Sequence, residues 1–490
     1  MTGLTDLCDW AAGLRYADVP ERVRALAASQ VLSQAAAIRA GLHHPLGRRL
    51  VTAFGPPLQA DPRQSAAVLA ALGSWLNLDD TAYAGHLSNS TVAVPLAHAH
   101  GLGLDGARLI TAVVAANEVA ARVTAAATLG PLRGQSAVHT HLAGAVAGRL
   151  HSEGAPGSRW ADALGLAFAM PHRPLMRAFL ASDARLLNTF TPVRAGLDAC
   201  DAAAAGLRGA PDLMEHPDGF LAAFADVPLP GALTDGLGER WYTETLSFKM
   251  RPGGPGIDAA VDCALELHRE LGGPAADEVA EVVVEASLYT LFAGRKAESY
   301  VTGPDAPLGA LVLHTPYPVA TALLTGRLAV ADFEGPLLAE PDRWRLADRV
   351  RVVHDPDLTR ALFASEAPFG EAVRAAGAGA GPWTRAFGGA ETEEIARRAN
   401  EGRAPSDFSR ATKTTGARVT VTLKDGRTLT RERLIPLGAA GPHTREHHAE
   451  LVREKFTGLG GAAATARAAA GLASMDAGGV RRWTADALTG

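Results

Sequence analysis

Two carboxylates, a hydroxyl and an imidazole lie close together at the end of an apolar helical pattern, in Asp79, Asp80, Thr81 and His86. Such a group can remove a proton from carbon and protonate a departing hydroxide, which is general acid–base chemistry. Asp and Thr also cap helix ends by accepting hydrogen bonds from free backbone amides, so the acidic triplet alone fits a structural role. His86 favours chemistry, because a helix end needs no imidazole beside two acids. The sequence therefore predicts an enzyme.

Other histidines and the Gly-rich stretches offer weaker candidates. His139 and His141 are two residues apart, a spacing at which helical side chains face different directions, so they do not predict a metal site. His443 and His447 are four apart and could share a helix face, either as metal ligands or as part of a polar outer surface. Neither a Gly-x-Ser-x-Gly elbow nor a phosphate-binding loop occurs, which argues against a serine hydrolase of the α/β type and a nucleotide site.

The acidic triplet lies in a first half that is typical of helix throughout, because apolar residues recur every three or four positions without strand-like alternation. Many of these segments are rich in Ala and carry little charge on any side, which predicts packing inside a helical bundle. The clearest helices are expected at residues 22–42, 64–78, 91–102, 106–127, 140–151 and 194–207.

The pattern changes near residues 245–256, where Pro and Gly break any regular element. A helix over 257–271, strands over 278–286 and 350–354, and a hairpin over 419–433 with its turn at Asp425 and Gly426 predict an α+β module. Helical patterning returns from about Thr444. We expect a mainly α fold, with a large helical domain from residues 1–243 and 435–490 and a smaller α+β lid from 244–434. The Ala and Gly run 376–381 is expected to be a mobile surface segment.

Composition limits the function classes further. The 490 residues are 47% hydrophobic and 20% charged, which predicts a globular protein with more than one domain. A net charge of −5, without clustered Lys and Arg among aromatics, argues against nucleic acid as a partner. Cys8, Cys200 and Cys263 are widely spaced and predict buried thiols in a reducing compartment. Acidic residues near the N-terminus argue against a signal peptide, and we expect a cytoplasmic protein with no membrane partner.

Several segments, in one order along the chain, resemble the MmgE/PrpD family, which includes 2-methylcitrate dehydratase and cis-aconitate decarboxylase. The resemblance covers nearly the whole chain, and the joint order of the segments is more specific than any one of them. The segments are 77–81 with 86–89, 117–122, 184–188 with 195–197, 219–220, 257–260, 316–317 through 323–327, 425–427 and 455–456.

The resemblance implies a homodimer whose subunit has a large helical domain and a smaller α+β lid. It also implies an active site in the cleft between them that uses no metal and no organic cofactor. By match to the family motifs, Asp80, Thr81, His86 and Tyr317 would line this cleft, and Arg185 would take the place of a family lysine.

The sequence departs from the family pattern at several cleft positions. Asn77 stands where the family usually has Asp, and an amide cannot act as a base at neutral pH. Asn188 stands where the family has His. The family Lys and His at the lid are replaced by Thr245 and the Gly-rich region near 253, which leaves Lys249 and Arg251 as displaced substitutes.

A further family His, which precedes a Gly-rich helix, aligns with either Ser136 or His139, and we favour His139. The sequence thus offers fewer cleft cations than the family pattern. A tricarboxylate needs several fixed cations, because each desolvated carboxylate left unpaired is costly. We therefore expect a substrate that is larger and less acidic than 2-methylcitrate and carries a β-hydroxy carbonyl or a related group.

The sequence predicts a cofactor-independent lyase of the dehydratase kind that acts on a small molecule. His86 or His139 would remove a proton alpha to a carbonyl, Asp80 would orient that base, and Tyr317 would protonate the departing hydroxide. Arg185 with Lys249 would stabilise the developing charge. The conjugated product accepts nucleophiles, so a second arm of the substrate could close a ring by Michael-type addition, as in specialised metabolism.

Two alternatives stay open. One is a 2-methylcitrate dehydratase, or a related small-carboxylate dehydratase or decarboxylase, in which the remaining cations suffice. The other is a catalytically retired scaffold or binding protein, which the loss of a carboxylate at Asn77 favours and the retained acid–base groups oppose.

Overall fold

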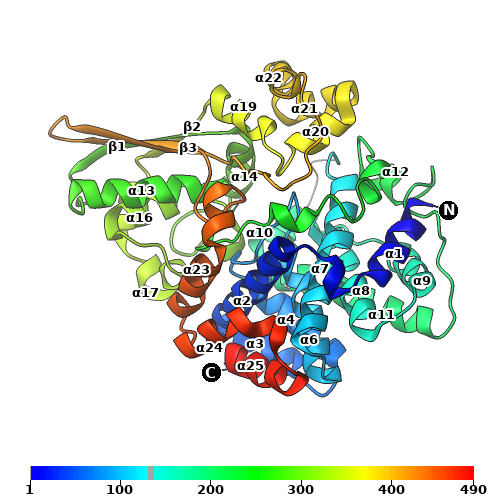
Figure 1. The fold of residues 1–490 in the computed structure, drawn as a ribbon. Helices are drawn as coiled ribbons and strands as arrows, with labels where there is room; N and C mark the ends of the chain where they lie inside the picture. Colours follow the sequence, from blue (N-terminus) through cyan, green and yellow to red (C-terminus); the bar gives the residue numbers. More distant parts are fainter. Residues whose placement is uncertain (1, 131–136, 255, 490) are drawn as a thin grey trace.

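The first half of the chain is a bundle of α-helices, as predicted (Figure 1). The computed structural model describes residues 2–130, 137–254 and 256–489. The helices of this part are α1 (Gly3–Gly13), α2 (Glu21–His43), α3 (Pro45–Phe54), α4 (Pro62–Ser74), α5 (Ser88–Thr91), α6 (Ala93–Leu102), α7 (Gly106–Ala126), α8 (Ala137–Glu153), α9 (Gly157–Ala167), α10 (Met176–Ala181), α11 (Ala184–Ala204) and α12 (Phe220–Phe224). Three 3₁₀ turns accompany them: η1 (Tyr16–Asp18), η2 (Pro230–Leu233) and η3 (Tyr242–Thr245).

Helix α4 leads into the acidic triplet, and local sequence sets where it begins and ends. Asp61 caps its N-terminus by accepting a hydrogen bond from Arg63 N at 2.9 Å. The helix ends at Ser74 rather than at the predicted residue 78. Asn77 then adopts a φ of 56°, in the left-handed region that Asn tolerates better than most residues. The triplet therefore lies in irregular backbone beyond the helix.

The second half contains the predicted α+β module. Its elements are α13 (Ile257–Leu271), β1 (Val279–Ala286), α14 (Leu288–Glu298), α15 (Leu308–Leu311), α16 (Pro316–Thr325), η4 (Val330–Phe333), α17 (Gly335–Leu338), α18 (Pro341–Ala347), β2 (Val350–His354), α19 (Pro356–Ala364), α20 (Gly370–Ala376), η5 (Gly377–Ala380), α21 (Gly381–Gly388), α22 (Ala390–Asn400), β3 (Ala417–Leu423) and β4 (Thr428–Arg433). The chain ends with α23 (Pro442–Gly458), α24 (Ala463–Ala468), η6 (Ala469–Ser474) and α25 (Ala477–Thr489).

The strands form one mixed sheet in the order β2-β1-β3-β4. Strand β1 pairs in parallel with β2, with Val282 opposite Val350, and antiparallel with β3, with Val282 opposite Val421. Buried and partly exposed residues alternate along β3, so one face of the sheet is covered. The buried face packs in one hydrophobic core with α13 and α16, and α13 lies along the sheet in Figure 1.

Two large hydrophobic cores organise the described part of the chain, and a small third cluster contains Leu180, Ala297 and Ala310. The larger joins the N-terminal helices to α23–α25, and α23 packs against α2, so the C-terminal helices return to the bundle as expected (Figure 1). The smaller lies between the sheet, α13 and α16. Helices α19–α22 bury Phe363, Trp383 and Phe387 in the larger core, although their residues lie in the predicted lid. The boundaries at residues 243 and 434 stay a prediction.

Close packing of α2 on α4 fixes the end of α4. A Cβ at Gly41 on α2 would lie 2.0 Å from the backbone oxygen of Leu72 on α4, so only glycine permits this approach.

The remaining sequence features have plain structural roles. Among the described residues, α7 is the one helix long and apolar enough to cross a membrane, and its most apolar window is fully buried inside the protein, as in a core helix. The three cysteines are buried and unpaired. The run 376–381 lies largely at the surface, as expected, and it closes α20, forms η5 and opens α21. Its mobility stays a prediction.

Candidate functional site

The centre of the candidate site is a histidine–aspartate pair between α4 and α5. His86 Nδ1 lies 2.6 Å from Asp79 Oδ2. The Asp79 carboxylate is buried, and its other oxygen, Oδ1, has no hydrogen-bond partner among the described residues. Asp79 thus binds Nδ1 of His86 through Oδ2, and its Oδ1 can still accept a hydrogen bond.

Electrostatics keep this pair in a defined protonation state. Burial raises the pKa of Asp79, but the charges of His86 and Lys249 and the hydrogen bond from His86 outweigh it, and the net pKa lies well below the ordinary value. Burial lowers the pKa of His86, with Asp79 opposing and Lys249 and Arg185 reinforcing the shift. At neutral pH the result is a carboxylate beside a neutral imidazole, which is the state of a general base.

The backbone around this pair is strained at one residue and held by hydrogen bonds at another. Tyr83 has a φ of 51°, a conformation that costs a bulky residue free energy. Thr81 exchanges two backbone hydrogen bonds with Ser247, of 3.0 Å and 2.7 Å. This small bridge ties the acidic triplet to the segment that carries Lys249.

A small cavity of about 20 Å³ lies beside His86. That volume holds about one water molecule, so a substrate needs the site to open. Among the side chains on its wall are those of Asn77, Asp79, His86, His141, Arg185 and Asn188. The structure therefore brings four of the predicted site residues, Asn77, His86, Arg185 and Asn188, to one place.

Several polar atoms at this cavity have no hydrogen-bond partner in the described part of the chain. They are Asp79 Oδ1, His141 Nδ1, Arg185 Nε and Asn188 Oδ1. Buried polar groups are normally paired, because leaving one unpaired costs free energy. Their convergence on one cavity indicates a place for a polar ligand.

Arg185 is fixed by Asn77, the residue that replaces a family Asp. Arg185 Nη2 donates to Asn77 Oδ1 at 2.7 Å, and Asn77 Nδ2 donates to Gly253 O at 2.7 Å. Burial lowers the pKa of Arg185 to about 10, with Asp79 opposing the shift, so the guanidinium stays charged at neutral pH. Asn77 thus links the cation to the second half of the chain.

A further lysine near the pair is Lys413, which no sequence pattern marks as a site residue. Its Nζ donates to Thr81 Oγ1 at 3.1 Å. Burial lowers the pKa of Lys413 to about 8, and the charge of Lys249 lowers it further while Asp258 and Asp79 oppose the shift. Lys413 lies between α22 and β3 in a stretch with no periodic pattern, so no signal in the sequence marked it.

The expectation that Asp80 orients His86 is wrong. Asp80 turns away into a buried network, where Ser33 Oγ donates to Oδ1 at 2.6 Å and Lys455 Nζ lies 3.4 Å from the same oxygen. Burial raises the pKa of Asp80 and lowers that of Lys455, and each partner's charge opposes the other's shift. Asp80 joins the C-terminal helix α23 to the bundle, while its neighbour Asp79 holds the imidazole.

The histidine of α8 that lies at the cavity is His141, not the predicted His139. The ring of His139 packs edge-on against Phe220 and Phe224, each with a centroid distance of 4.8 Å. His141 lies on another face of α8 and lines the cavity with His86. Burial lowers the pKa of His141 to about 3, and the charge of His86 lowers it further while Asp79 opposes the shift. Ser136, the alternative to His139, lies outside the described residues.

Tyr317 and Arg251 do not lie on the wall of this cavity. Tyr317 is buried in the smaller core, and its hydroxyl donates to Asp332 O at 2.5 Å. Arg251 forms an ion pair of 2.7 Å with Asp262. The expected proton donor and one expected cation thus have structural contacts in the second half of the chain.

Metal binding has little structural support. Among the described residues, no group of three or more His, Cys, Asp or Glu side chains is arranged to hold a metal ion. His443 and His447 lie on α23 with ring centroids 4.7 Å apart, and His447 is close to Glu446 and Glu450. These side chains form a polar outer helix face.

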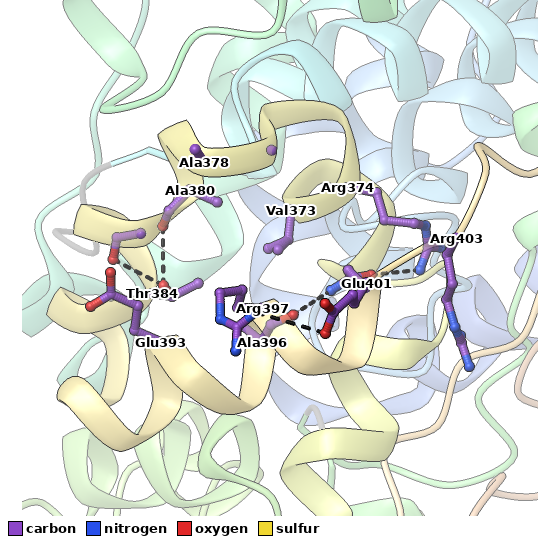
Figure 2. Close-up of a pocket in the computed structure, with 13 residues that line it drawn as sticks. Val373, Arg374, Ala378, Ala380, Thr384, Glu393, Ala396, Arg397, Glu401 and Arg403 are labelled. Carbon is purple, nitrogen blue, oxygen red and sulfur yellow. Dashed lines mark hydrogen bonds and ion pairs between the residues drawn. The ribbon is translucent and has the colours of Figure 1, made fainter.

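A larger cavity of about 420 Å³ lies among α20, α21 and α22, and Figure 2 shows its wall. Its charged groups are paired: Arg374 donates to Asn400 at 2.8 Å, Arg397 contacts Glu394 at 2.9 Å, and Glu393 accepts from Arg385 at 2.7 Å. Within the described residues, no buried polar atom on this wall lacks a partner. Size alone therefore does not identify the functional site.

Comparison with known families finds matches to two models of one family. The model of the MmgE/PrpD N-terminal domain matches residues 5–230, and that of the MmgE/PrpD C-terminal domain matches residues 254–377. A comparison with curated proteins finds no significant match. The first match contains the His86–Asp79 pair, His141 and Arg185, whereas Lys249 and Lys413 lie outside both matches.

Proposed function

Since the chain belongs to the MmgE/PrpD family, whose members are typically dehydratases or decarboxylases, we propose that it is a lyase in which His86 removes a proton from carbon. The observation that carries this proposal is the His86–Asp79 pair on a cavity lined by unpaired polar atoms. The family shows the class of enzyme, and the roles below are inferred from the geometry.

The first step is proton transfer from the carbon alpha to a carbonyl. Because Asp79 Oδ2 accepts the proton of Nδ1, the neutral imidazole of His86 carries its lone pair on Nε2. Nε2 takes the proton, and the buried carboxylate of Asp79 stabilises the imidazolium that forms. The electron pair of the broken C–H bond moves toward the carbonyl oxygen as an enolate.

One positive group on the cavity wall and one near it stabilise this enolate. The guanidinium of Arg185 is held toward the cavity by Asn77, and the ammonium of Lys249 is close enough to influence the pKa values of Asp79 and His86. A fixed cation in a water-poor site acts strongly on developing negative charge.

The second step expels the β-hydroxyl group. The imidazolium of His86 returns its proton to the departing hydroxide, so that water leaves and a double bond forms between the alpha and beta carbons. Tyr317 has no role in this step, because its hydroxyl is engaged with Asp332 O in the smaller core. The neutral imidazole of His141 is able to hydrogen-bond the leaving group or the water it becomes.

The substrate we favour is a β-hydroxy carbonyl compound larger than 2-methylcitrate, in specialised metabolism. Asn77 and Asn188 at the cavity support it, since amides replace family groups that carry or gain charge. The conjugated product is open to Michael-type attack by a second arm of the same molecule, which would close a ring. No cofactor is needed for either step, because the chain supplies the base and the cations.

One observation favours the small-carboxylate alternative. Lys413 adds a cation that the sequence analysis did not count, so the site holds more positive charge than expected. A dehydratase or decarboxylase acting on 2-methylcitrate or a similar acid would use that charge. Turnover of purified protein with 2-methylcitrate decides between the two: a rate typical of enzymes selects the small acid.

Variants of His86 test the proposal against a retired scaffold. We expect His86→Asn to lower kcat/KM by about 100- to 10,000-fold on any accepted hydroxy acid, with an unchanged melting temperature. Turnover is followed by the ultraviolet absorbance of the conjugated product. Equal activity of His86→Asn and wild type would contradict the proposed base, and no turnover by wild type on any hydroxy acid would favour the scaffold.

We further propose a homodimer that acts in the cytoplasm. Leu175 and Leu187, at the start of α10 and on α11, are 74% and 41% exposed, which supports a contact between subunits on this side. Unpaired buried cysteines fit a reducing compartment. Light scattering gives the mass, and a monomer at micromolar concentration would refute the dimer.

A further inference from the structure

Lys413 reaches the candidate site from a part of the chain that neither family match covers. Its backbone is held on two sides, because its N–H donates to Ala440 O at 2.9 Å and it forms a bridge with Ala367. Its side chain extends to the acidic triplet, where Nζ donates a hydrogen bond to Thr81 Oγ1 at 3.1 Å. The ammonium is therefore placed by the fold.

Lys249 presents a second ammonium to the same region. Its side chain is 6% exposed, and Nζ has no hydrogen-bond partner in the described residues. Ser247, two residues before Lys249, exchanges backbone hydrogen bonds with Thr81, so the segment of Lys249 lies beside the acidic triplet. The charge of Lys249 acts on Asp79, His86 and Lys413. A buried cation without a partner is costly, so the site is prepared for an anion.

The two lysines are poorly neutralised by the protein. Across the ranges that the structure describes, neither ammonium forms an ion pair with a carboxylate. Asp79 is engaged with His86, and Asp258 acts on both lysines without contacting either as an ion pair. Two like charges near each other in a buried place disfavour one another, and an incoming anion relieves that repulsion.

We propose that Lys413 is a substrate-binding residue, and that its ammonium and that of Lys249 together receive one carboxylate of the substrate beside the His86 base. Thr81 acts as a positioning residue, because its hydroxyl accepts a hydrogen bond from Lys413. The inference rests on the proposed function, and it adds Lys413, a residue outside the family-matched segments, to the groups that bind the substrate.

The test measures carboxylate binding rather than turnover. The melting temperature of the full-length protein is recorded near neutral pH with increasing malonate, succinate or citrate. We expect at least one of these anions to stabilise the wild type. We expect Lys413→Met to weaken its binding about 10- to 100-fold, the effect of losing a charged hydrogen bond in a buried site.

Two variants serve as controls. Lys424→Met removes an exposed lysine at the hairpin turn and should bind as the wild type does. Lys413→Arg keeps the charge and should retain most of the binding, which a purely structural role of Lys413 would not predict. The inference is overturned if no carboxylate stabilises the wild type, or if Lys413→Met binds as tightly as Lys424→Met.

The pH dependence tests the same residue in the wild type, in case Lys413→Met does not fold. The pKa of Lys413 is lowered to about 8, so its ammonium is present below that pH and is lost as the pH rises through it. Carboxylate binding should therefore weaken above about pH 8 in the wild type and persist to about pH 9.5 in Lys413→Arg. Identical pH profiles would contradict the inference.

His86→Asn separates this inference from the proposed function. The variant should lose turnover and still bind the carboxylate. Retained turnover in His86→Asn, with lost binding in Lys413→Met, would refute the base and leave the anion site. Lost turnover in His86→Asn, with unchanged binding in Lys413→Met, would support His86 as the base and refute the anion site.

Discussion

The two cavities of this molecule differ in what their walls leave unpaired. The cavity among α20, α21 and α22 has a volume of about 420 Å³, and Figure 2 shows its wall. Its charged side chains form ion pairs: Arg374 with Glu371, Arg397 with Glu394 and Glu401, and Glu393 with Arg385. The cavity beside His86 has a volume of about 20 Å³, yet Asp79, His141, Arg185 and Asn188 each keep a polar atom without a partner among the described residues.

Unpaired buried polar atoms therefore locate a functional site better than the volume of a cavity does. A folded protein pairs its buried polar groups wherever it can, because each unpaired group costs free energy. Unpaired groups that persist together at one place, beside strained backbone at Tyr83, indicate a function that repays the cost.

The largest effect is expected from the adjacent carboxylates. Asp79→Asn should lower kcat/KM by about 1,000-fold or more, because an amide no longer holds the tautomer and charge of His86. Asp80→Asn should instead lower the free energy of unfolding by about 3 kcal/mol, because it leaves the buried Lys455 uncompensated. Steady-state kinetics and urea unfolding measure the two effects.

Asp79→Asn and Asp80→Asn serve as controls for each other, because each replaces a buried carboxylate by an amide at adjacent positions. If Asp80→Asn abolished turnover in a fully folded protein while Asp79→Asn stayed active, the pairing of His86 with Asp79 would not be the catalytic one.

The next effect separates the two histidines of α8. His141→Asn should reduce kcat about 10- to 100-fold, because it removes a hydrogen-bonding imidazole from the cavity. His139→Asn should leave kcat of the folded protein nearly unchanged and lower its stability, since it only disturbs the packing on Phe220 and Phe224. A larger loss of kcat in His139→Asn would restore the sequence-based choice.

Stability should fall as the pH drops from about 6.5 toward 4. Burial lowers the pKa of His44 and His139 to about 4 and that of His141 to about 3, so the unfolded chain binds protons in this window that the folded chain does not. Stability therefore rises with pH here and levels off above about 6.5. Urea unfolding at several pH values measures the slope.

A matched variant checks the cause of that slope. His141→Asn should flatten it, because one group that titrates only in the unfolded chain is removed. An unchanged slope would mean that His141 is not held neutral by burial.

The smallest effect is expected at the larger cavity. Ala378 lies on its rim and is exposed, so Ala378→Phe should fill the opening without disturbing a core. We expect kcat/KM to stay within about 2-fold of the wild type, as is usual for surface changes away from a site. A loss of activity comparable to that of His141→Asn would reverse the comparison between the cavities.

Most of the fold could be predicted from the sequence because its elements carry strong periodic patterns. The helices at 22–42 and 106–127, the strand at 350–354 and the hairpin turn at Asp425 and Gly426 are confirmed within a few residues. The helix expected to reach residue 78 ends at Ser74, because the chain turns through Asn77 into irregular backbone. Periodicity does not describe such a segment.

Four of the predicted site residues, Asn77, His86, Arg185 and Asn188, line one cavity, but the contacts among the site residues could not be predicted. Which of Asp79 and Asp80 faces His86 is decided by Ser33 and Lys455, which come from distant parts of the chain and claim Asp80. The spacing of His139 and His141 predicted that they face different ways, yet not which one faces the cavity. Lys413 left no signal at all, because only the fold brings its segment to Thr81.

The most direct test of the account is proton exchange at carbon. Wild type and variants are incubated in D₂O with a hydroxy acid that the wild type turns over, and deuterium at the carbon alpha to the carbonyl is followed by NMR. If His86 is the base held by Asp79, exchange should be lost by about 1,000-fold in His86→Asn and retained in His139→Asn. Exchange at the wild-type rate in folded His86→Asn would contradict the account.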